Sequence, residues 1–154
     1  PPLHSSAASD VYKRQYGNVS GVELKDGVYY KPFTTLEGIA EKHSGIEPFN
    51  VGNTLLNKIS EKDYGDYYFE KIDSVPVNFI STLDITNGNS GSATINSDFD
   101  LVGLAFDGML ETIIADYKYI PQARTISVDS RYLLWTLEKI EGADSILEEL
   151  EIVK

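Results

Sequence analysis

Short apolar runs separated by turn residues, with one late switch to a helical repeat, constrain the fold of this chain more than any other feature. The runs have the length and composition of β-strands, and Gly, Asn, Asp and Ser lie between them. They cover residues 77–83, 93–96, 101–106 and 125–128. From Leu133 on, apolar residues recur on one helical face. Many short strands before a terminal helix predict a mainly β fold, an antiparallel barrel with C-terminal α-helices.

The segments before residue 77 are less regular. Residues 16–31 predict two short strands joined by a turn, and residues 34–43 predict a short helix capped by Thr34 or Thr35. Residues 45–76 mix Gly, Pro, Asn and aromatic side chains. This composition indicates a long loop with short helical turns.

The first fifteen residues have no apolar period and do not blend into the next segment. The run from Ser9 to Gln15 resembles translated sequencing-adapter read-through, and a disordered native tail is the alternative. We therefore expect residues 1–15 to be a non-native tail and residues 16–154 to be one domain that begins inside a longer gene. On this interpretation His4 is not a candidate catalytic residue.

Length and composition exclude several classes of protein. A chain of 154 residues is long enough for one domain with a hydrophobic core. Its net charge of −11 repels phosphate backbones, so we expect no nucleic-acid partner. With no Cys and two His, we expect no disulfide, no metal site and no cofactor. No run of 18 apolar residues occurs, so we expect no membrane span.

One segment, Asn87-Gly88-Asn89-Ser90-Gly91-Ser92, carries the residue types of a catalytic turn. Nucleophilic acyl transfer needs a serine hydroxyl on a tight turn and backbone N–H groups directed at the oxyanion that forms. Ser90 is the candidate nucleophile, and the backbone N–H groups of Gly88 and Ser90 are the candidate oxyanion hole. A simple polar turn is the alternative.

The segment after this turn decides between two kinds of serine hydrolase. The nucleophile elbow of α/β-hydrolases needs G-x-S-x-G between a strand and a helix. Here Ser92 takes the place of the last glycine, and a β-like run comes next. A glycine-flanked serine, a short strand, a turn and then Leu101-Val102-Gly103 favour the chymotrypsin-like pattern.

The chain resembles the C-terminal end of the bacterial dipeptidyl-peptidase 7 and 11 family. The matching blocks are GNSGS at 88–92, LVGLAFDG at 101–108, RTISVDSRYLLWTLEKIEGAD at 124–144, YGNVSG at 16–21 and VYYKPFTTLEGIAEKH at 28–43. The resemblance implies the second barrel of a chymotrypsin-like double barrel, into which a large helical domain is inserted. It also implies a serine exopeptidase, an aminopeptidase-type enzyme that releases dipeptides from the free N-terminus of peptides, in the periplasm or at the cell surface and as a homodimer.

The same resemblance implies roles for three residues. Ser90 matches the nucleophile, Asp107 the carboxylate that holds the α-ammonium of the substrate, and Gly108 the position that sets preference at the primary specificity pocket. Type 11 has Arg at that position and prefers acidic substrates, whereas type 7 has Gly and prefers apolar ones. Gly108 therefore indicates a hydrophobic preference before the cut bond. The alternative for Asp107 and Gly108 is that both are ordinary turn residues.

Three positions depart from the family pattern. Ala93 stands where Pro is usual, Met109-Leu110-Glu111 stands where Asn-Trp-Glu is common, and Asn87 stands where Gly is common. These changes flank the pocket, so they weaken its assignment and leave that of Ser90 intact.

A serine nucleophile needs a histidine base oriented by a carboxylate. The resemblance implies that both lie in the N-terminal barrel, outside this chain. His43 ends a predicted helix among polar residues, which is typical of a surface histidine. We therefore expect the isolated chain to be inactive and poorly folded, because the N-terminal barrel and the helical domain are its partners in a longer chain. An endopeptidase of the same fold and a non-catalytic peptide-binding relative are the alternatives.

Overall fold

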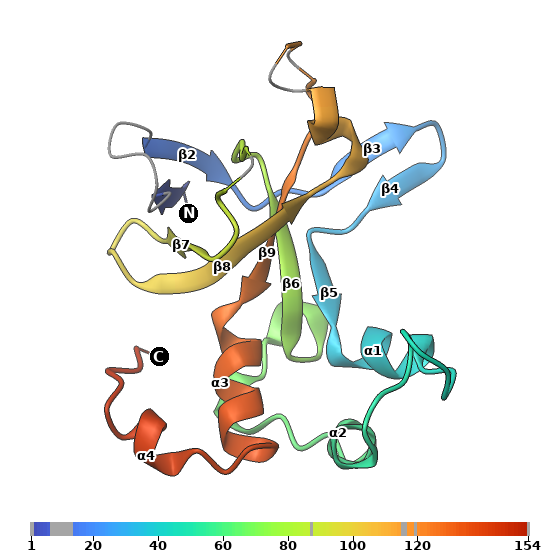
Figure 1. Cartoon of the computed structure of the whole chain (residues 1–154), viewed down its shortest axis with the longest axis vertical. Helices are drawn as coiled ribbons and strands as arrows, with labels where there is room; N and C mark the ends of the chain where they lie inside the picture. Colours follow the sequence, from blue (N-terminus) through green and yellow to red (C-terminus); the bar gives the residue numbers. More distant parts are fainter. Residues whose placement is uncertain (1, 7–13, 87, 115–116, 119, 154) are drawn as a thin grey trace. The chain divides into compact units, whose positions relative to one another are not determined.

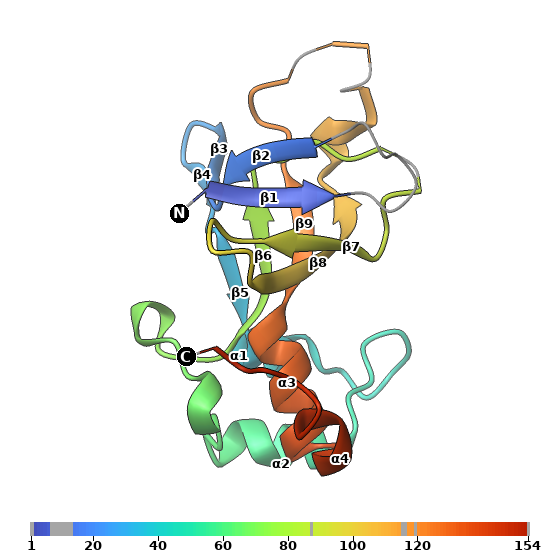
Figure 2. The ribbon, with the colours of Figure 1, turned by 90° about the vertical axis from the view of Figure 1, so that its left-hand side faces the viewer.

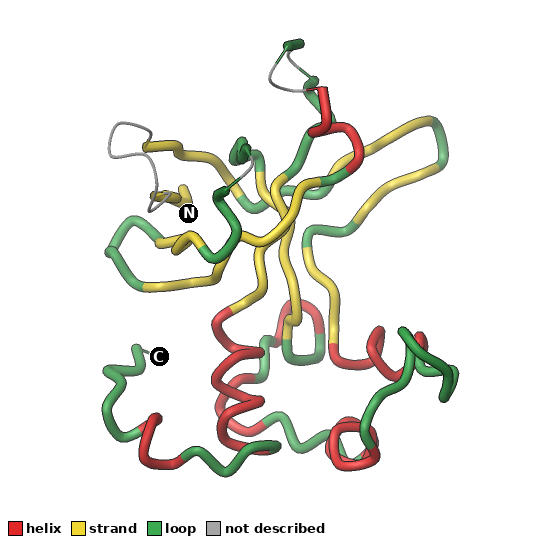
Figure 3. Tube along the Cα trace, in the orientation of Figure 1, coloured by secondary structure: helices red, strands yellow, loops and turns green. Residues whose placement is uncertain are grey.

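The computed structural model describes residues 2–6, 14–86, 88–114, 117–118 and 120–153. The chain divides into two compact units at residues 33–34, 77–78 and 130–131. One unit contains most of the strands and the other most of the helices (Figure 3). The prediction of a mainly β fold with C-terminal helices is confirmed.

The β unit is built on a sheet whose strand order is β2-β1-β7-β8-β9-β6-β5 (Figure 1). Its members are β1 (Pro2–Ser6), β2 (Arg14–Asn18), β5 (Phe33–Thr35), β6 (Pro76–Ser81), β7 (Ser92–Ile95), β8 (Leu101–Gly108) and β9 (Thr125–Asp129). A separate antiparallel hairpin joins β3 (Val22–Lys25) to β4 (Val28–Tyr30). Figure 2 shows β1 and β7 running across the direction of β6 and β9, so the sheet is strongly twisted.

Strand β1 is a difference from the sequence analysis, which assigned no element to residues 1–15. The backbone of β1 pairs antiparallel with both β2 and β7, in a register that sets Ser5 opposite Gln15 and Thr94. Strand pairing uses backbone N–H and C=O groups, which every non-proline residue carries, so an apolar pattern is not required. Residues 7–13 lie outside the described residues, and the non-native origin of residues 1–15 stays a prediction.

A small apolar cluster forms one part of the interior of the β unit. Phe79 and Leu83 are buried, and Val19, Phe33 and Val102 pack against them. This packing explains the glycine of the L-V-G run. A Cβ at position 103 would lie 2.7 Å from a ring atom of Phe79, so only glycine fits there.

Hydroxyl groups form the other part of that interior. The inward face of β9 carries Thr125 and Ser127, both fully buried. The Oγ1 atom of Thr125 donates to the backbone oxygen of Leu83 at 2.6 Å, and Ser127 shares a 3.4 Å hydrogen bond with Thr94. Buried polar groups require such partners, and these bonds tie β9 to its neighbours.

The helical unit packs around Trp135, the single tryptophan of the chain. Its ring is fully buried with Leu36 and Val75, and its Nε1 atom donates to the backbone oxygen of Asp63 at 2.8 Å. The predicted helix at 34–43 is confirmed, and Thr35 takes the N-cap position. The helices are α1 (Leu36–Lys42), α2 (Asn53–Ser60), α3 (Ser130–Lys139) and α4 (Asp144–Leu147), with 3-10 turns at Gly65–Tyr67 and Glu70–Ile72. Within the described part of the chain, no helix has the length and apolar character needed to cross a membrane.

Candidate active site

The turn that carries Ser90 is fastened to strand β8. The backbone N–H of Gly91 donates to the oxygen of Ala105 at 2.7 Å, and the Ser90 hydroxyl donates to the oxygen of Phe106 at 3.2 Å. Gly91 has a φ of 87°, a backbone conformation that side-chain-bearing residues rarely adopt. The two bonds to consecutive carbonyl groups hold the serine at a defined position along the strand.

A β-bulge in β8 makes the carbonyl of Phe106 available to Ser90. In the pairing with β9, Ala105 lies opposite Ser127 and Asp107 lies opposite Ile126, so Phe106 is the extra residue. A bulged residue is left out of the ladder, and the side chains after it are turned to a new direction. Asp107 and Gly108 therefore do not follow the alternation between the two faces of the sheet that an uninterrupted strand would impose.

Among the described residues, the backbone N–H groups predicted as an oxyanion hole meet no protein acceptor. Neither the N–H of Gly88 nor that of Ser90 donates a hydrogen bond within this part of the chain, whereas the N–H of Asn89 between them donates to Thr86. Gly88 has a φ of 92°, which glycine adopts without strain. Within the described part of the turn, the two N–H groups without an acceptor therefore alternate with one that has an acceptor.

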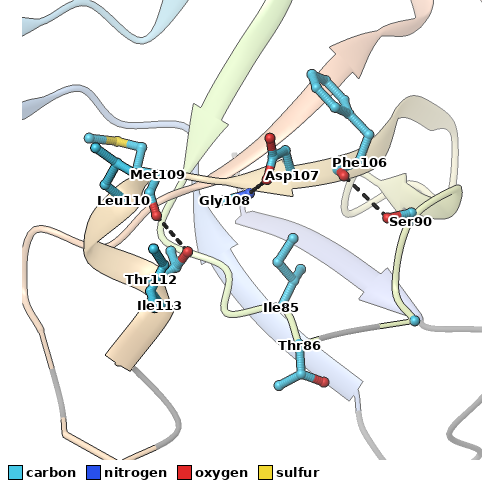
Figure 4. Close-up of a pocket in the computed structure, with 11 residues that line it drawn as sticks. Ile85, Thr86, Ser90, Phe106, Asp107, Gly108, Met109, Leu110, Thr112 and Ile113 are labelled. Atoms are coloured by element: carbon cyan, nitrogen blue, oxygen red, sulfur yellow. Dashed lines mark hydrogen bonds between the residues drawn. The ribbon is translucent and has the colours of Figure 1, made fainter.

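A pocket of about 440 Å³ brings all the predicted site residues together (Figure 4). Ser90, Gly88, Asp107 and Gly108 all contribute to its walls. The remaining lining residues are Ile85, Thr86, Phe106, Met109, Leu110, Thr112 and Ile113. Among the described residues that line this pocket, Asp107 is the single charged one, and most of the large side chains are apolar.

Asp107 lies exposed at this pocket. Its Oδ1 atom accepts the backbone N–H of Gly108 at 2.8 Å, which restricts the carboxylate to one side of the strand. A carboxylate has four lone-pair directions, so this bond leaves acceptor capacity for a cationic group.

Sequence reasoning missed Arg124, which supports the pocket wall through Met109. Its guanidinium is buried and donates to four backbone oxygens, those of Ser20, Gly21, Pro121 and Ala123, at 2.7–3.2 Å. Its own backbone oxygen accepts the N–H of Met109 at 3.0 Å. The only signal for this residue in the sequence was its place at the start of one matching block.

The sequence analysis predicted a surface residue at His43, whereas the structure shows it half-buried and hydrogen-bonded. Its Nδ1 atom accepts the backbone N–H of Val51 at 3.0 Å, which closes the loop after α1. Within the residues described, the hydroxyl of Ser90 bonds to a carbonyl oxygen and to no imidazole. The described residues also contain no group of three or more His, Cys, Asp and Glu that could hold a metal ion.

Comparison with solved structures defines the class of fold. The crystal structure of Porphyromonas endodontalis DPP11 in complex with the dipeptide Arg-Asp matches 90% of this chain with a TM-score of 0.86 and 35% identity. The fold is accordingly chymotrypsin-like and mainly β, with helices after the last strand.

The family follows from sequence comparison. A model of the peptidase S46 family matches residues 12–152, so the chain belongs to peptidase family S46. It is 41% identical to dipeptidyl-peptidase 7 of Phocaeicola vulgatus over its whole length and 38% identical to an Asp/Glu-specific dipeptidyl-peptidase of Shewanella putrefaciens over 96% of its length. The chain spans 22% and 23% of these two relatives, and 20% of the DPP11 structure.

Proposed function

We propose that this chain is the nucleophile-bearing part of a longer serine peptidase that releases dipeptides from the free N-terminus of peptides. The observation that carries the proposal is that Gly88 and Ser90 of the serine turn line one pocket with Asp107 and Gly108, whose roles the resemblance implies. Membership of peptidase family S46 and the similarity to dipeptidyl-peptidases support it.

In the proposed reaction, the Ser90 hydroxyl attacks the carbonyl carbon of the second peptide bond of the substrate. A histidine from outside this chain takes the hydroxyl proton and later gives it to the leaving amine. The negative charge that develops on the carbonyl oxygen is stabilised by the N–H groups of Gly88 and Ser90. Water then attacks the acyl-enzyme as the same histidine takes its proton, and that proton returns to the Ser90 oxygen when the dipeptide leaves. The bond from Ser90 to the oxygen of Phe106 is exchanged for one to the base before attack.

Asp107 is the proposed acceptor for the α-ammonium of the substrate. An exopeptidase must recognise the free terminus, and a carboxylate beside the nucleophile binds a cation and not a blocked amide. The exposed carboxylate at the pocket that also contains Ser90 supports this role.

The pocket wall supports an apolar preference before the cut bond. The curated relatives include both a dipeptidyl-peptidase 7 and an Asp/Glu-specific enzyme, so similarity alone does not choose between them. An acidic side chain would need a cationic partner, and Asp107 would repel it instead. Glycine at position 108 and the apolar side chains of Ile85, Leu110 and Ile113 favour an apolar side chain.

The whole protein is proposed to be exported and larger than this chain. We place it in the periplasm or at the cell surface, as a homodimer in which the N-terminal barrel and the helical domain of the same chain complete the site. A non-catalytic peptide-binding relative, or an endopeptidase of the same fold, is the competing function.

The test uses the full-length protein that contains this chain. Fluorogenic dipeptidyl substrates with Leu, Phe or Asp before the cut bond are compared with N-terminally blocked versions, and Ser90→Ala is compared with Ser97→Ala in an exposed turn. We expect cleavage of the free Leu and Phe substrates, and a loss of about 10⁴-fold or more in kcat for Ser90→Ala only. Cleavage of blocked peptides would favour the endopeptidase, and binding without cleavage would favour the non-catalytic relative.

A further inference from the structure

We propose that Thr112 is a specificity-determining residue, because its side chain fills the space beside Gly108 and so limits how far a substrate side chain extends into the pocket. This inference rests on the proposed function and adds a residue to it. Thr112 lies in the 3-10 turn η3 (Leu110–Ile114), which comes just after β8. Both Thr112 and Gly108 line the pocket that contains Ser90 (Figure 4).

The close approach of Thr112 explains why position 108 carries glycine. A Cβ at this position would lie 3.0 Å from both Cβ and Cγ2 of Thr112, and closer still to its Oγ1. Carbon atoms at optimal contact are about 3.5–4.0 Å apart, so a side chain here would overlap with the threonine. Gly108 is not among the residues of positive φ. Its backbone would accept other residues, and the lack of space alone requires glycine.

Thr112 is held in place and does not simply swing aside. Its Oγ1 atom donates to the backbone oxygen of Met109 at 2.6 Å, and its backbone N–H donates to the same oxygen at 2.8 Å. The Met109 side chain is buried, and its N–H donates to the oxygen of Arg124. This chain of bonds makes the threonine a fixed part of the wall.

Thr112 therefore limits the size of the bound side chain. A substrate side chain that reaches the surface of Gly108 meets Thr112 next, since both belong to one wall. Removing Cγ2 and Oγ1 of Thr112 would extend the pocket by about the volume of two heavy atoms. One methylene in a hydrophobic pocket changes relative rates by about 10-fold or more.

Two substitutions separate the shape of Thr112 from its hydrogen bond. Thr112→Ala removes both branches, whereas Thr112→Val keeps the shape and removes only the donor to Met109. In the full-length protein we expect Thr112→Ala to raise the ratio of kcat/KM for Phe over Ala before the cut bond by about 10-fold. We expect Thr112→Val to keep the ratio of the wild type. An equal change in both variants, or none in either, would overturn the inference.

A second measurement does not depend on activity. The midpoint of urea unfolding is measured for Gly108→Ala, Thr112→Ala and the double variant, which together form a double-mutant cycle. In a control cycle, Thr54→Ala on the exposed face of α2 takes the place of Thr112→Ala. We expect Gly108→Ala to lower the midpoint more in the wild type than in the Thr112→Ala background. In the Thr54→Ala background it should lower the midpoint as much as in the wild type. If positions 108 and 112 are coupled but the full-length protein releases no dipeptides, the proposed function is contradicted and the steric pairing is not. Additive effects at positions 108 and 112 would contradict the steric pairing itself.

Discussion

Arg124 illustrates at the scale of one residue how a buried charge organises a site. Arg124 is only 9% exposed, and all the hydrogen bonds that the structure describes for its guanidinium end on carbonyl oxygens. Two of these oxygens belong to Ser20 and Gly21, more than 100 positions away in sequence. A planar group with five donors in fixed directions can bridge such separate segments.

Replacing Arg124 by Met should therefore destabilise the β unit. The substitution keeps an apolar stem of similar length and leaves four carbonyl oxygens without their donors, so we expect a loss of about 3 kcal/mol in the free energy of unfolding. Urea denaturation of the full-length protein measures it. Lys118→Met, on an exposed part of the same loop, is the control and should change the stability by less than about 0.5 kcal/mol. Equal losses in both variants would contradict the role given to Arg124.

At the scale of the element, strand β8 and helix α1 show two different effects of tertiary contacts. The bulge at Phe106 turns one end of β8 into a pocket wall, since it directs Asp107 and Gly108 to the pocket. Helix α1, whose Leu36 is buried in the core, is also held by one carboxylate. Glu37 accepts hydrogen bonds from the hydroxyl groups of Tyr64 and Ser74, which lie in the segment between α2 and β6.

These bonds around Glu37 predict an acid-sensitive helical unit. Burial on its own raises the pKa of the Glu37 carboxyl, but the hydrogen bonds from Ser74 and Tyr64 outweigh it and hold the pKa below its ordinary value. A carboxyl whose folded-state pKa is lowered stabilises the fold above the unfolded-state pKa, and this contribution is lost as the pH falls through the folded-state value. We expect the urea midpoint of the full-length protein to decrease as the pH falls below about 4.3, and Glu37→Gln to weaken this dependence on pH.

In Glu37→Gln the dependence of the urea midpoint on pH should not vanish, because two other carboxyl groups of the same unit also have lowered pKa values. A hydrogen bond from Lys58 is the main cause for Asp63, and one from Lys139 is the main cause for Glu138. Tyr64→Phe is the matched variant. This substitution removes one donor to Glu37 and leaves the carboxylate in place. The dependence of its urea midpoint on pH should therefore lie between that of the wild type and that of Glu37→Gln. An unchanged dependence on pH in both variants would contradict the assignment.

At the scale of the whole molecule, the described chain carries the serine turn and its pocket, while the histidine base is expected outside it. Several large apolar side chains of the β unit are also exposed around this pocket, among them Leu110 at 81% and Ile113 at 72%. Such a surface is usually covered by another part of a protein. The small share of the relatives that the chain spans agrees with this expectation.

We therefore expect the isolated 154-residue chain to release no dipeptides under conditions in which the full-length protein does so. A serine without its histidine keeps only the small rate enhancement of the oxyanion hole and of binding. Steady-state assays compare the isolated chain with the full-length protein at equal molar concentration. Binding of a hydrophobic dye compares the apolar surface that each of them exposes. Turnover by the isolated chain that Ser90→Ala abolishes would show that the base lies within these residues.

Much of the site could be predicted from the sequence because it depends on local order. The turn around Ser90 needs glycines at fixed spacing, and the strands and the terminal helix follow from the period of apolar residues. Neighbouring residues decide such features, so Ser90 and Gly88 could be named from the order of residues, whereas the roles of Asp107 and Gly108 came from the family resemblance. The pairing of β1 could not, because a strand held by backbone bonds leaves no apolar pattern.

The order of residues was enough to predict the class of fold, the family resemblance and the candidate nucleophile. The pocket that Thr112 shares with Ser90, the bulge at Phe106 and the burial of Arg124 could be seen only in the folded chain. These features depend on register and packing between segments far apart in the chain. No local pattern encodes which carbonyl groups a buried guanidinium meets, or how much room a neighbouring turn leaves beside a glycine.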